Sequence, residues 1–428
     1  MLTEAKESTG DTTEFPDSEA HMAFSQEKPS SHASQQTCIS PPSPPTAPDG
    51  GSRAWLQVLG GFIIYFNTWG LMISFGVFQS YYQNHVLTDY SPSAVSWIGT
   101  IQAFFLIEIG VIAGPLYDRG LLRHILATGA ILLTLGVMFT IGVCTGIGMG
   151  CMFFPGITCI STYFSKKRGI ASGIAATGSG VGAIVYPIVL RELIARISFP
   201  WAVRTVGFMV LATSLVPLAV MRPLWLPSGG ANRHRLFDRT VLPDRVYMFW
   251  SLTNVVGWLG LQVPLFYVNV YGEKELGMSQ HDAFYLSAIL GAGSLPGRII
   301  MALVSDWVGP LWAYPVCMAF AGIVALAWIG VNSLGGLLVV VVLYGFAYGG
   351  ISSLPPTAIA ALTTDMATLG TRIGTSFSFA GIAMLIGPPI GGVIRNSGFK
   401  AVFAFSGATV LAGSFLLFGA AFLHRRSL

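Results

Sequence analysis

Residues 167–188 read KRGIASGIAATGSGVGAIVYPI, and residues 371–392 read TRIGTSFSFAGIAMLIGPPIGG. Each stretch has arginine at its second position, continues as a glycine-rich apolar run and reaches proline late. An earlier pair recurs in the same order, with GPLYDRGLLRH at Gly114–His124 and a looser copy, ALVSDWVG, at Ala302–Gly309. Two pairs in one order at similar distances indicate that the chain consists of two related halves.

The sequence around these repeats is apolar over long distances. A helix that crosses the hydrocarbon core of a bilayer needs about 20 mostly apolar residues. Twelve stretches fit: Trp55–Ser80, Ala94–Tyr117, Ile125–Ile141, Gly142–Phe164, Gly169–Leu190, Trp201–Met221, Val246–Tyr271, Ala283–Val304, Leu311–Val331, Leu334–Leu362, Ile373–Ile394 and Phe399–Leu423. The sequence therefore predicts an all-α membrane protein with twelve transmembrane helices in two six-helix bundles.

Four domains are expected from this pattern. They are a disordered cytoplasmic N-terminal tail (1–50), an N-terminal six-helix bundle (51–222), a cytoplasmic loop between the bundles (223–245) and a C-terminal six-helix bundle (246–424). The tail has a net charge of −6 and is rich in Ser, Thr and Pro, a composition typical of disorder. It lacks the basic and then apolar plan of a secretory signal.

The overall composition excludes several classes of protein. The chain is 53% hydrophobic and 10% charged, whereas soluble domains carry roughly 25% charged residues. Its Lys and Arg residues lie in short groups between apolar runs, so we expect no nucleic-acid partner. The five cysteines form no CxxC pair, so neither a disulfide framework nor a metal site is predicted.

The distribution of basic residues predicts the topology, because cytoplasmic loops carry an excess of Lys and Arg. Of the 21 basic residues beyond residue 50, 14 fall on one side of the predicted spans, six fall on the other, and Arg298 lies within a span. Both termini are therefore expected in the cytoplasm.

The stretch Ile125–Phe164 is the most ambiguous part of the count of twelve spans, because its 40 residues contain no charged residue that would mark a turn. One helix of that length would measure about 60 Å, and a single crossing would place Lys166–Arg168 on the wrong side. We therefore predict two short helices joined near Thr140–Gly148. Asp118 and Asp306 are 188 residues apart and Arg168 and Arg372 are 204 apart, so the first half is 16 residues shorter here. Either this hairpin is truncated, or the sequence comes from a splice variant or a misread gene.

The GPLYDRG motif and its second-half copy suggest a conformational latch formed by Gly114, Asp118, Arg119 and Asp306. An Asp at a helix end can make charge-assisted contacts to a neighbouring helix end and release them in another conformation. The alternative is a polar loop that only anchors two spans. The glycine-rich faces of 167–188 and 371–392 allow helices to approach closely.

Two further stretches give the chain a family resemblance. PDGGSRAW at Pro48–Trp55 and YFSKKRGIASGIA at Tyr163–Ala175, together with GPLYDRG, resemble signatures of the major facilitator superfamily and of the fungal branch of its monocarboxylate porter family. The resemblance implies alternating access around a central site, commonly driven by protons or other ions. It also implies that Arg298 pairs with substrate. The family's acid four residues earlier is replaced by Ser294, and Trp69–Ser80 lacks the family's lysine.

Polar residues within the spans are the candidates for a binding site, because an ionisable group costs about 3 kcal/mol or more at the bilayer centre. Arg298 could bind a carboxylate; alternatively, it pairs with Asp306 or extends to the interface. Glu108 is predicted to couple transport to protons, with a structural carboxyl as the alternative. The uncharged candidates for substrate binding, each of which could instead join helices, are Asn67, Trp69, Asn254, Gln262 and Tyr267.

No enzyme motif is recognisable in the sequence. GxxxxGK[ST], HExxH and GxSxG are all missing, so we expect neither an enzyme nor a cofactor. The sequence predicts a secondary transporter in the plasma membrane that moves a small organic solute, either a monocarboxylate-like anion or a secondary metabolite. Its expected partners are that solute, the lipid bilayer and protons. Two alternatives are an efflux pump for the product of a biosynthetic gene cluster and a non-transporting membrane sensor.

Overall fold

The computed structural model describes residues 48–90, 92–139, 141–224 and 244–427. Within these residues all regular elements are helices, and twelve helical stretches are long and apolar enough to cross a membrane. The prediction of an all-α protein with twelve spans is confirmed. The predicted tail (1–50) and the loop 223–245 fall mostly outside the described residues.

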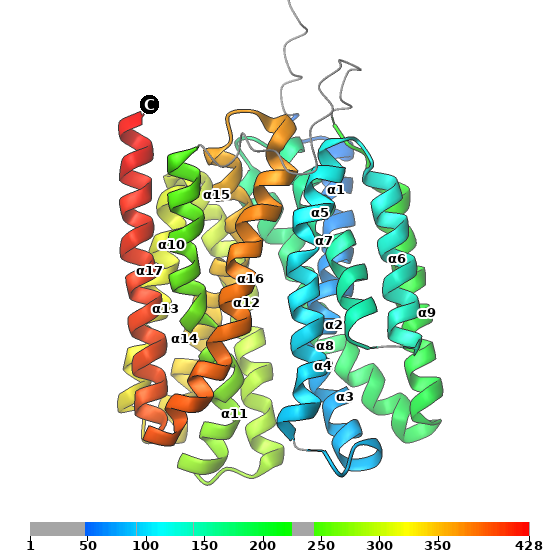
Figure 1. The fold of residues 1–428 in the computed structure, drawn as a ribbon, viewed down its shortest axis with the longest axis vertical. Helices are drawn as coiled ribbons and strands as arrows, with labels where there is room; N and C mark the ends of the chain where they lie inside the picture. The colour runs from blue at the N-terminus through cyan, green and yellow to red at the C-terminus, as the bar shows by residue number, and fades with distance from the viewer. Residues whose placement is uncertain (1–47, 91, 140, 225–243, 428) are drawn as a thin grey trace, which may run out of the picture. The chain divides into compact units, whose positions relative to one another are not determined.

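The first six spans come from nine α-helices (Figure 1). The first span joins α1 (Ser52–Tyr65), a π-helical segment (Phe66–Gly70), α2 (Leu71–Ile73) and α3 (Phe75–Tyr81), and the second joins α4 (Pro92–Glu108) and α5 (Gly110–Asp118). The remaining four are α6 (Leu122–Phe139), α7 (Val143–Tyr163), α8 (Arg168–Arg196) and α9 (Phe199–Val220).

The second six spans repeat this plan. They are α10 (Arg245–Leu261) with α11 (Val263–Glu275), α12 (Gln280–Val308), α13 (Pro310–Ala327), α14 (Leu334–Ser353) with α15 (Pro355–Leu362), α16 (Leu369–Ile394) and α17 (Phe399–Ser427). The break between α10 and α11 falls at Gln262, because Pro264 at the second position of α11 lacks the N–H that a continuous helix requires.

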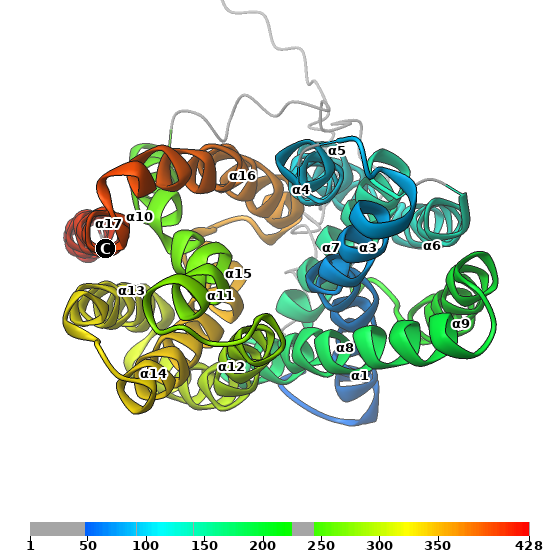
Figure 2. The same ribbon diagram turned by 90° about the horizontal axis from the view of Figure 1, so that it is seen from below.

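Two groups of helices are visible along the bundle axis. Figure 2 shows α1 to α9 on one side and α10 to α17 on the other, with α16 beside α4 and α5, and α12 beside α8. Buried apolar side chains form one cluster mainly within the first group and a second cluster within the second group. Phe377 of α16 belongs to the first cluster, so the two halves pack together there.

Both ends of the described chain lie on the same side of the bundle. The helix α1 begins and α17 ends at the top of Figure 1, and we call this the chain-end side. The connections α5–α6, α7–α8 and α12–α13 also lie on this side, because each follows an even number of crossings.

The hairpin of α6 and α7 consists of two helices, as the sequence predicts. Gly142 forms the turn with φ of 128°, a conformation that favours glycine. The two spans contain 18 and 21 residues, whereas their second-half counterparts contain 21 and 29. Figure 1 shows the α6–α7 turn ending well short of the lower ends of α3 and α9. Phe139 beside the turn is 73% exposed as a result.

Candidate functional site

Arg298 lies at middle depth in α12, about 15 Å along the helix from its chain-end terminus at 1.5 Å per residue. Its side chain is 4% exposed. Nη1 donates to the Ser294 hydroxyl at 2.9 Å, and Nε lies 3.4 Å from the Ser352 hydroxyl. Among the described residues, no carboxylate forms an ion pair with Arg298. The guanidinium is therefore a buried cation with neutral partners, an arrangement that is costly unless an anion joins it.

Glycine on the neighbouring helix leaves room for this arginine. A Cβ atom on Gly180 of α8 would lie 2.3 Å from Leu295 Cδ2 and 3.2 Å from Arg298 Nη1. Gly173, two turns earlier, lies against the Arg298 backbone carbonyl. The glycine-rich face that the sequence predicts as a close-packing surface thus lies against the segment of α12 that carries Arg298.

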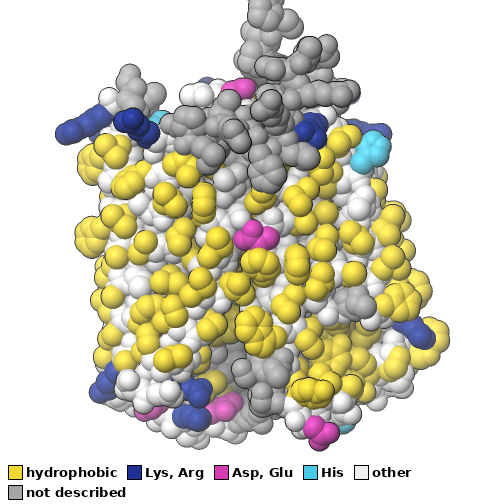
Figure 3. Space-filling view, viewed as in Figure 1, with side chains coloured by type: hydrophobic (Ala, Val, Ile, Leu, Met, Phe, Trp, Pro, Cys, Tyr) yellow, Lys and Arg dark blue, Asp and Glu magenta, His cyan; other side chains and the backbone are white. Residues whose placement is uncertain are grey.

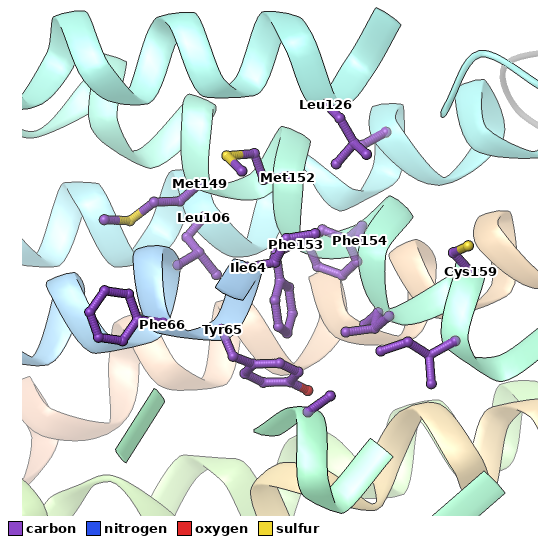
Figure 4. Close-up of a cluster of buried hydrophobic side chains, with 14 of the residues drawn as sticks. Ile64, Tyr65, Phe66, Leu106, Leu126, Met149, Met152, Phe153, Phe154 and Cys159 are labelled. Carbon is purple, nitrogen blue, oxygen red and sulfur yellow. The ribbon is translucent and has the colours of Figure 1, made fainter. Parts of the chain in front are cut away.

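Aromatic side chains lie close to Arg298. Tyr65 and Tyr348 are both near its guanidinium, and the Tyr65 and Phe153 rings are 5.2 Å apart. Figure 4 shows Tyr65, Phe153 and Phe154 together in the first apolar cluster. Phe377 of α16 packs against Phe154 at 5.6 Å. The cluster therefore extends from α1 and α7 to a helix of the other half.

Two predicted site residues in this region have polar atoms that remain unpaired. Trp69 packs edge-on against Phe153 at 5.8 Å, and its Nε1 is buried without a hydrogen-bond partner among the described residues. Gln262, at the α10–α11 break, is 4% exposed, and its Oε1 is also unpaired there. Buried polar groups are normally paired, so one donor and one acceptor are available to a bound solute.

The other uncharged candidates already have protein partners. Asn67 donates to Ser214 at 3.0 Å and accepts from Tyr186 at 2.7 Å and Thr213 at 2.9 Å, all within the first half. The structure places Asn67 in an interhelical hydrogen-bond network.

Asn254 and Tyr267 bond within the second half. Asn254 accepts from Tyr314 at 2.6 Å. The Tyr267 hydroxyl donates to the Pro388 carbonyl at 3.0 Å, toward the side opposite the chain ends. These contacts join helices, as expected if Asn254 and Tyr267 hold the bundle together and do not bind substrate.

Glu108 and Arg298 lie at two different seams, the lines along which helices of the two halves meet. Glu108 lies where α4 meets α16. It ends α4, and its Oε2 accepts from Ser378 of α16 at 2.5 Å, while Oε1 has no partner among the described residues. Figure 3 shows an acidic side chain midway up the apolar face, over this seam. The Arg298 seam, between α8 and α12, lies across the bundle in Figure 2.

The predicted latch residues form two matching contacts on the chain-end side. Asp118, at the end of α5, accepts from the backbone N–H groups of Gly370 (2.8 Å) and Thr371 (2.7 Å) at the start of α16. Asp306, late in α12, accepts from the N–H groups of Gly169 (2.6 Å) and Ile170 (2.8 Å) at the start of α8. A carboxylate at a helix N-terminus satisfies unpaired donors and the helix dipole.

Gly114 allows the first of these contacts to form. A Cβ atom at Gly114 would lie 2.2 Å from the carbonyl oxygen of Gly370, closer than any side chain tolerates. Arg119 immediately follows Asp118 at the end of α5. The structure thus brings Gly114 and Asp118 to the contact with α16, and places Asp306 in the equivalent contact with α8.

Two aspartates that the sequence analysis did not single out support these contacts. Asp49 precedes α1 and accepts from the backbone N–H groups of Ser165 and Lys166, just before α8. Asp244 precedes α10 and accepts from Arg372 of α16 at 2.8 Å. Each follows a proline, with Asp49 three residues before α1 and Asp244 directly before α10, and this Pro-Asp pair is the signal that they share in the sequence.

We call the two sets the first knot (Asp49 and Asp306 around the start of α8) and the second knot (Asp244 and Asp118 around the start of α16). Both lie on the chain-end side. Toward the other side, α8 presents Val181, Ile184 and Ile188, which are 37%, 47% and 57% exposed. In this conformation the α8–α12 and α5–α16 seams are joined on the chain-end side.

Comparison with known proteins relates this architecture to carriers. The sequence profile of the Major Facilitator Superfamily matches residues 58–368. The "MFS-type transporter dbaD" of Emericella nidulans is 39% identical over 385 residues, which cover 86% of this chain and 86% of the relative. The "Aspyridones efflux protein apdF" of the same fungus is 36% identical and covers 90% of this chain and 82% of its own.

A solved structure shares the fold at low sequence identity. A crystal structure of the E. coli fucose:proton symporter, FucP, superposes with a TM-score of 0.66 and 16% identity, covering 86% of this chain and 98% of the symporter.

Proposed function

Because this chain belongs to the major facilitator superfamily and is a membrane transporter, we propose that it exports a small acidic secondary metabolite from a fungal cell. Export is supported by relatives such as the one named an aspyridones efflux protein, 36% identical over most of both chains. Efflux, which the sequence predicts as an alternative, is therefore the direction of transport that we propose.

The acidic cargo is inferred from the buried Arg298, whose side-chain hydrogen bonds among the described residues are to the hydroxyls of Ser294 and Ser352. A guanidinium binds a carboxylate with two parallel hydrogen bonds, and Tyr65 and Tyr348 are near enough to interact with it electrostatically. Trp69 and Gln262 add one free donor and one free acceptor among the described residues. This lining suits a planar or partly apolar molecule that carries an acidic group.

The narrower assignment to the monocarboxylate porter family remains a prediction. PDGGSRAW and the stretch before α8 support it, whereas Ser294 stands at the place of the expected acid and carries no ionisable group. A cargo larger than a simple monocarboxylate agrees better with the aromatic cluster around Tyr65.

We propose further that the chain-end side faces the cytoplasm and that the membrane is the plasma membrane. The excess of basic residues on that side supports the orientation. The two knots would then close the cytoplasmic side, and the present conformation would be the one that releases cargo outward. Their rupture would expose the Arg298 site inward.

The test uses the full chain in proteoliposomes with radiolabelled 2-naphthoate as probe and neutral 2-naphthamide for comparison. We expect saturable 2-naphthoate flux that Arg298→Ala abolishes and Arg298→Lys restores in part, because lysine keeps the charge without the bidentate geometry. Arg204→Ala is the matched control, since Arg204 is exposed and stacks on Trp201 at 5.1 Å, away from the site.

Three outcomes would contradict the proposal. Normal 2-naphthoate flux in inserted Arg298→Ala protein would remove Arg298 from the site. Binding without flux would favour the sensor alternative. In the producing fungus, deletion of the gene should leave the acidic product inside the cells, and unchanged secretion would reject export.

A further inference from the structure

A groove lies between α6 and α9 on the chain-end side, and its lining includes neither Arg298 nor a knot residue. It has a volume of about 410 Å³ and is lined by Arg123, His124, Ala127, Leu218 and Arg222. Arg123 and His124 belong to the first turn of α6, and Arg222 follows the end of α9 closely. Figure 3 shows basic and histidine side chains at this edge of the molecule. The volume is in the range of small-molecule sites.

The charge in the groove is uncompensated within the described part of the chain. Its ion pairs join Arg196 to Glu192 and Arg372 to Asp244, and none includes Arg123 or Arg222. Both arginines are exposed, so their guanidinium groups are available to an anion. His124 adds a ring nitrogen at the same edge.

One wall of the groove is held in place by hydrogen bonds. The Arg222 backbone N–H donates to Gln57 of α1 at 3.0 Å. Its carbonyl accepts from the Tyr163 hydroxyl at 3.1 Å and lies 3.3 Å from Cys159 Sγ, both of α7. This segment would therefore lose little conformational entropy when a ligand binds.

Below the groove, the same two helices present an apolar track. Ile131 and Leu135 follow Ala127 at successive turns of α6 and are 56% and 47% exposed. Leu215, one turn before Leu218 on α9, is 58% exposed. A ligand with a charged head and apolar tails would match the groove and the track together.

We propose that this groove binds the headgroup of an anionic glycerophospholipid, with the phosphate between Arg123, His124 and Arg222 and the acyl chains along α6 and α9. Basic pockets between transmembrane helices bind anionic headgroups in this way. A free phosphate shares the headgroup chemistry but would not use the apolar track. The proposal requires only that α6 and α9 lie in a bilayer and does not depend on the cargo.

The experiment measures lipid binding to the purified full-length transporter by native mass spectrometry. Dioleoylphosphatidylserine is titrated against dioleoylphosphatidylcholine, and inorganic phosphate is added in a separate arm. We expect preferential retention of phosphatidylserine, and affinity about 30-fold weaker in the Arg123→Gln/Arg222→Gln variant, because each arginine contributes severalfold near the headgroup plane.

The matched control is Arg425→Gln/Arg426→Gln, which removes the same charge from exposed positions on the chain-end side at the end of α17. It should retain phosphatidylserine as the unchanged protein does. Ala127→Trp keeps every charge but fills the groove, so it should also weaken phosphatidylserine binding. It provides the test if the double arginine variant folds poorly.

Equal affinity for the two lipids would overturn the proposal. So would phosphatidylserine binding that survives both the double variant and Ala127→Trp, or that inorganic phosphate displaces as effectively as added phosphatidylserine does.

Discussion

In the proposed mechanism, two ionisable side chains at middle depth bind the transported anion and the proton. Arg298 and Glu108 lie in two different seams, and each has an unmet electrostatic requirement. Arg298 has neutral hydroxyl partners, and Glu108 has one carboxylate oxygen without a partner among the described residues. Ionisable residues at this depth are retained mainly for function. We therefore propose that the anion binds at the first seam and that the proton is carried at the second.

Removing the charge at Glu108 tests the second assignment. In Glu108→Gln, we expect flux that no longer depends on the pH gradient, because the amide keeps the size and the contact to Ser378 but cannot carry a proton. Flux in proteoliposomes with and without an imposed gradient measures this. Ser378→Ala is the control, since it keeps the carboxylate and should keep the dependence. An unaltered pH response in Glu108→Gln would reject coupling through this residue.

A bulkier residue at Gly114 tests the close contact of α5 with α16. In Gly114→Val, the Cβ atom would overlap the Gly370 carbonyl at 2.2 Å, so the closed chain-end side should be lost. We expect a transport rate at least about tenfold lower, since overlap with backbone costs more than about 1.4 kcal/mol. Gly335→Val provides the comparison, because no atom lies within 4 Å of a Cβ there. Similar rates in the two variants would show that the contact is dispensable.

At the scale of elements, much of the fold could be predicted because each span must be apolar over its full length. The count of twelve and the division of Ile125–Phe164 at a glycine turn follow from that requirement. The knots were only half predictable. Asp118 and Asp306 appear in a repeated motif, whereas Asp49 and Asp244 acquire their role from helix starts more than 100 residues away.

Contacts within the bundle likewise limited the prediction of the site. Asn67 and Asn254 look available in the sequence because an amide within a span has no obvious partner. In the fold, Tyr186 and Tyr314 supply those partners from other helices. Sequence spacing does not reveal such pairs, and it also leaves open a pair between Arg298 and Asp306, which the fold instead places at the start of α8.

The start of α10 offers a stability test at this scale. Asp244 both caps α10 through the Tyr247 N–H and pairs with Arg372. Asp244→Ala should lower the free energy of unfolding by about 2 kcal/mol, within the range for a lost cap and a partly buried partner. Thermal unfolding in detergent measures this. Asp365→Ala removes an exposed carboxylate from a short turn and should change the free energy of unfolding little. An equal decrease in both variants would contradict a stabilising role of the second knot.

At the scale of the whole molecule, the two knots should act additively, because they lie at different seams and share no residue. Asp118→Asn and Asp306→Asn each remove a charge from a helix start. Each should raise the population open on the chain-end side about tenfold, and the double variant about a hundredfold.

Spin labels at Leu121→Cys and Met366→Cys, with the native cysteines replaced, would report this opening, since both positions are exposed on the chain-end side in different halves. Asp89→Asn, exposed on the opposite side, should leave the distance distribution unchanged. A double variant no more open than either single variant would mean that one knot alone holds the halves together.

The short α6–α7 hairpin has a consequence for the surrounding lipid. Eighteen residues of α6 span about 27 Å, which is less than the hydrocarbon thickness of a typical plasma membrane, about 32 Å. Acyl tails next to this hairpin must splay or tilt to cover Phe139 and its neighbours, so the leaflet on that flank forms a shallow dimple. The transporter would then deform its bilayer on one flank only, and neighbours with equally short helices would gather there because they share the deformation.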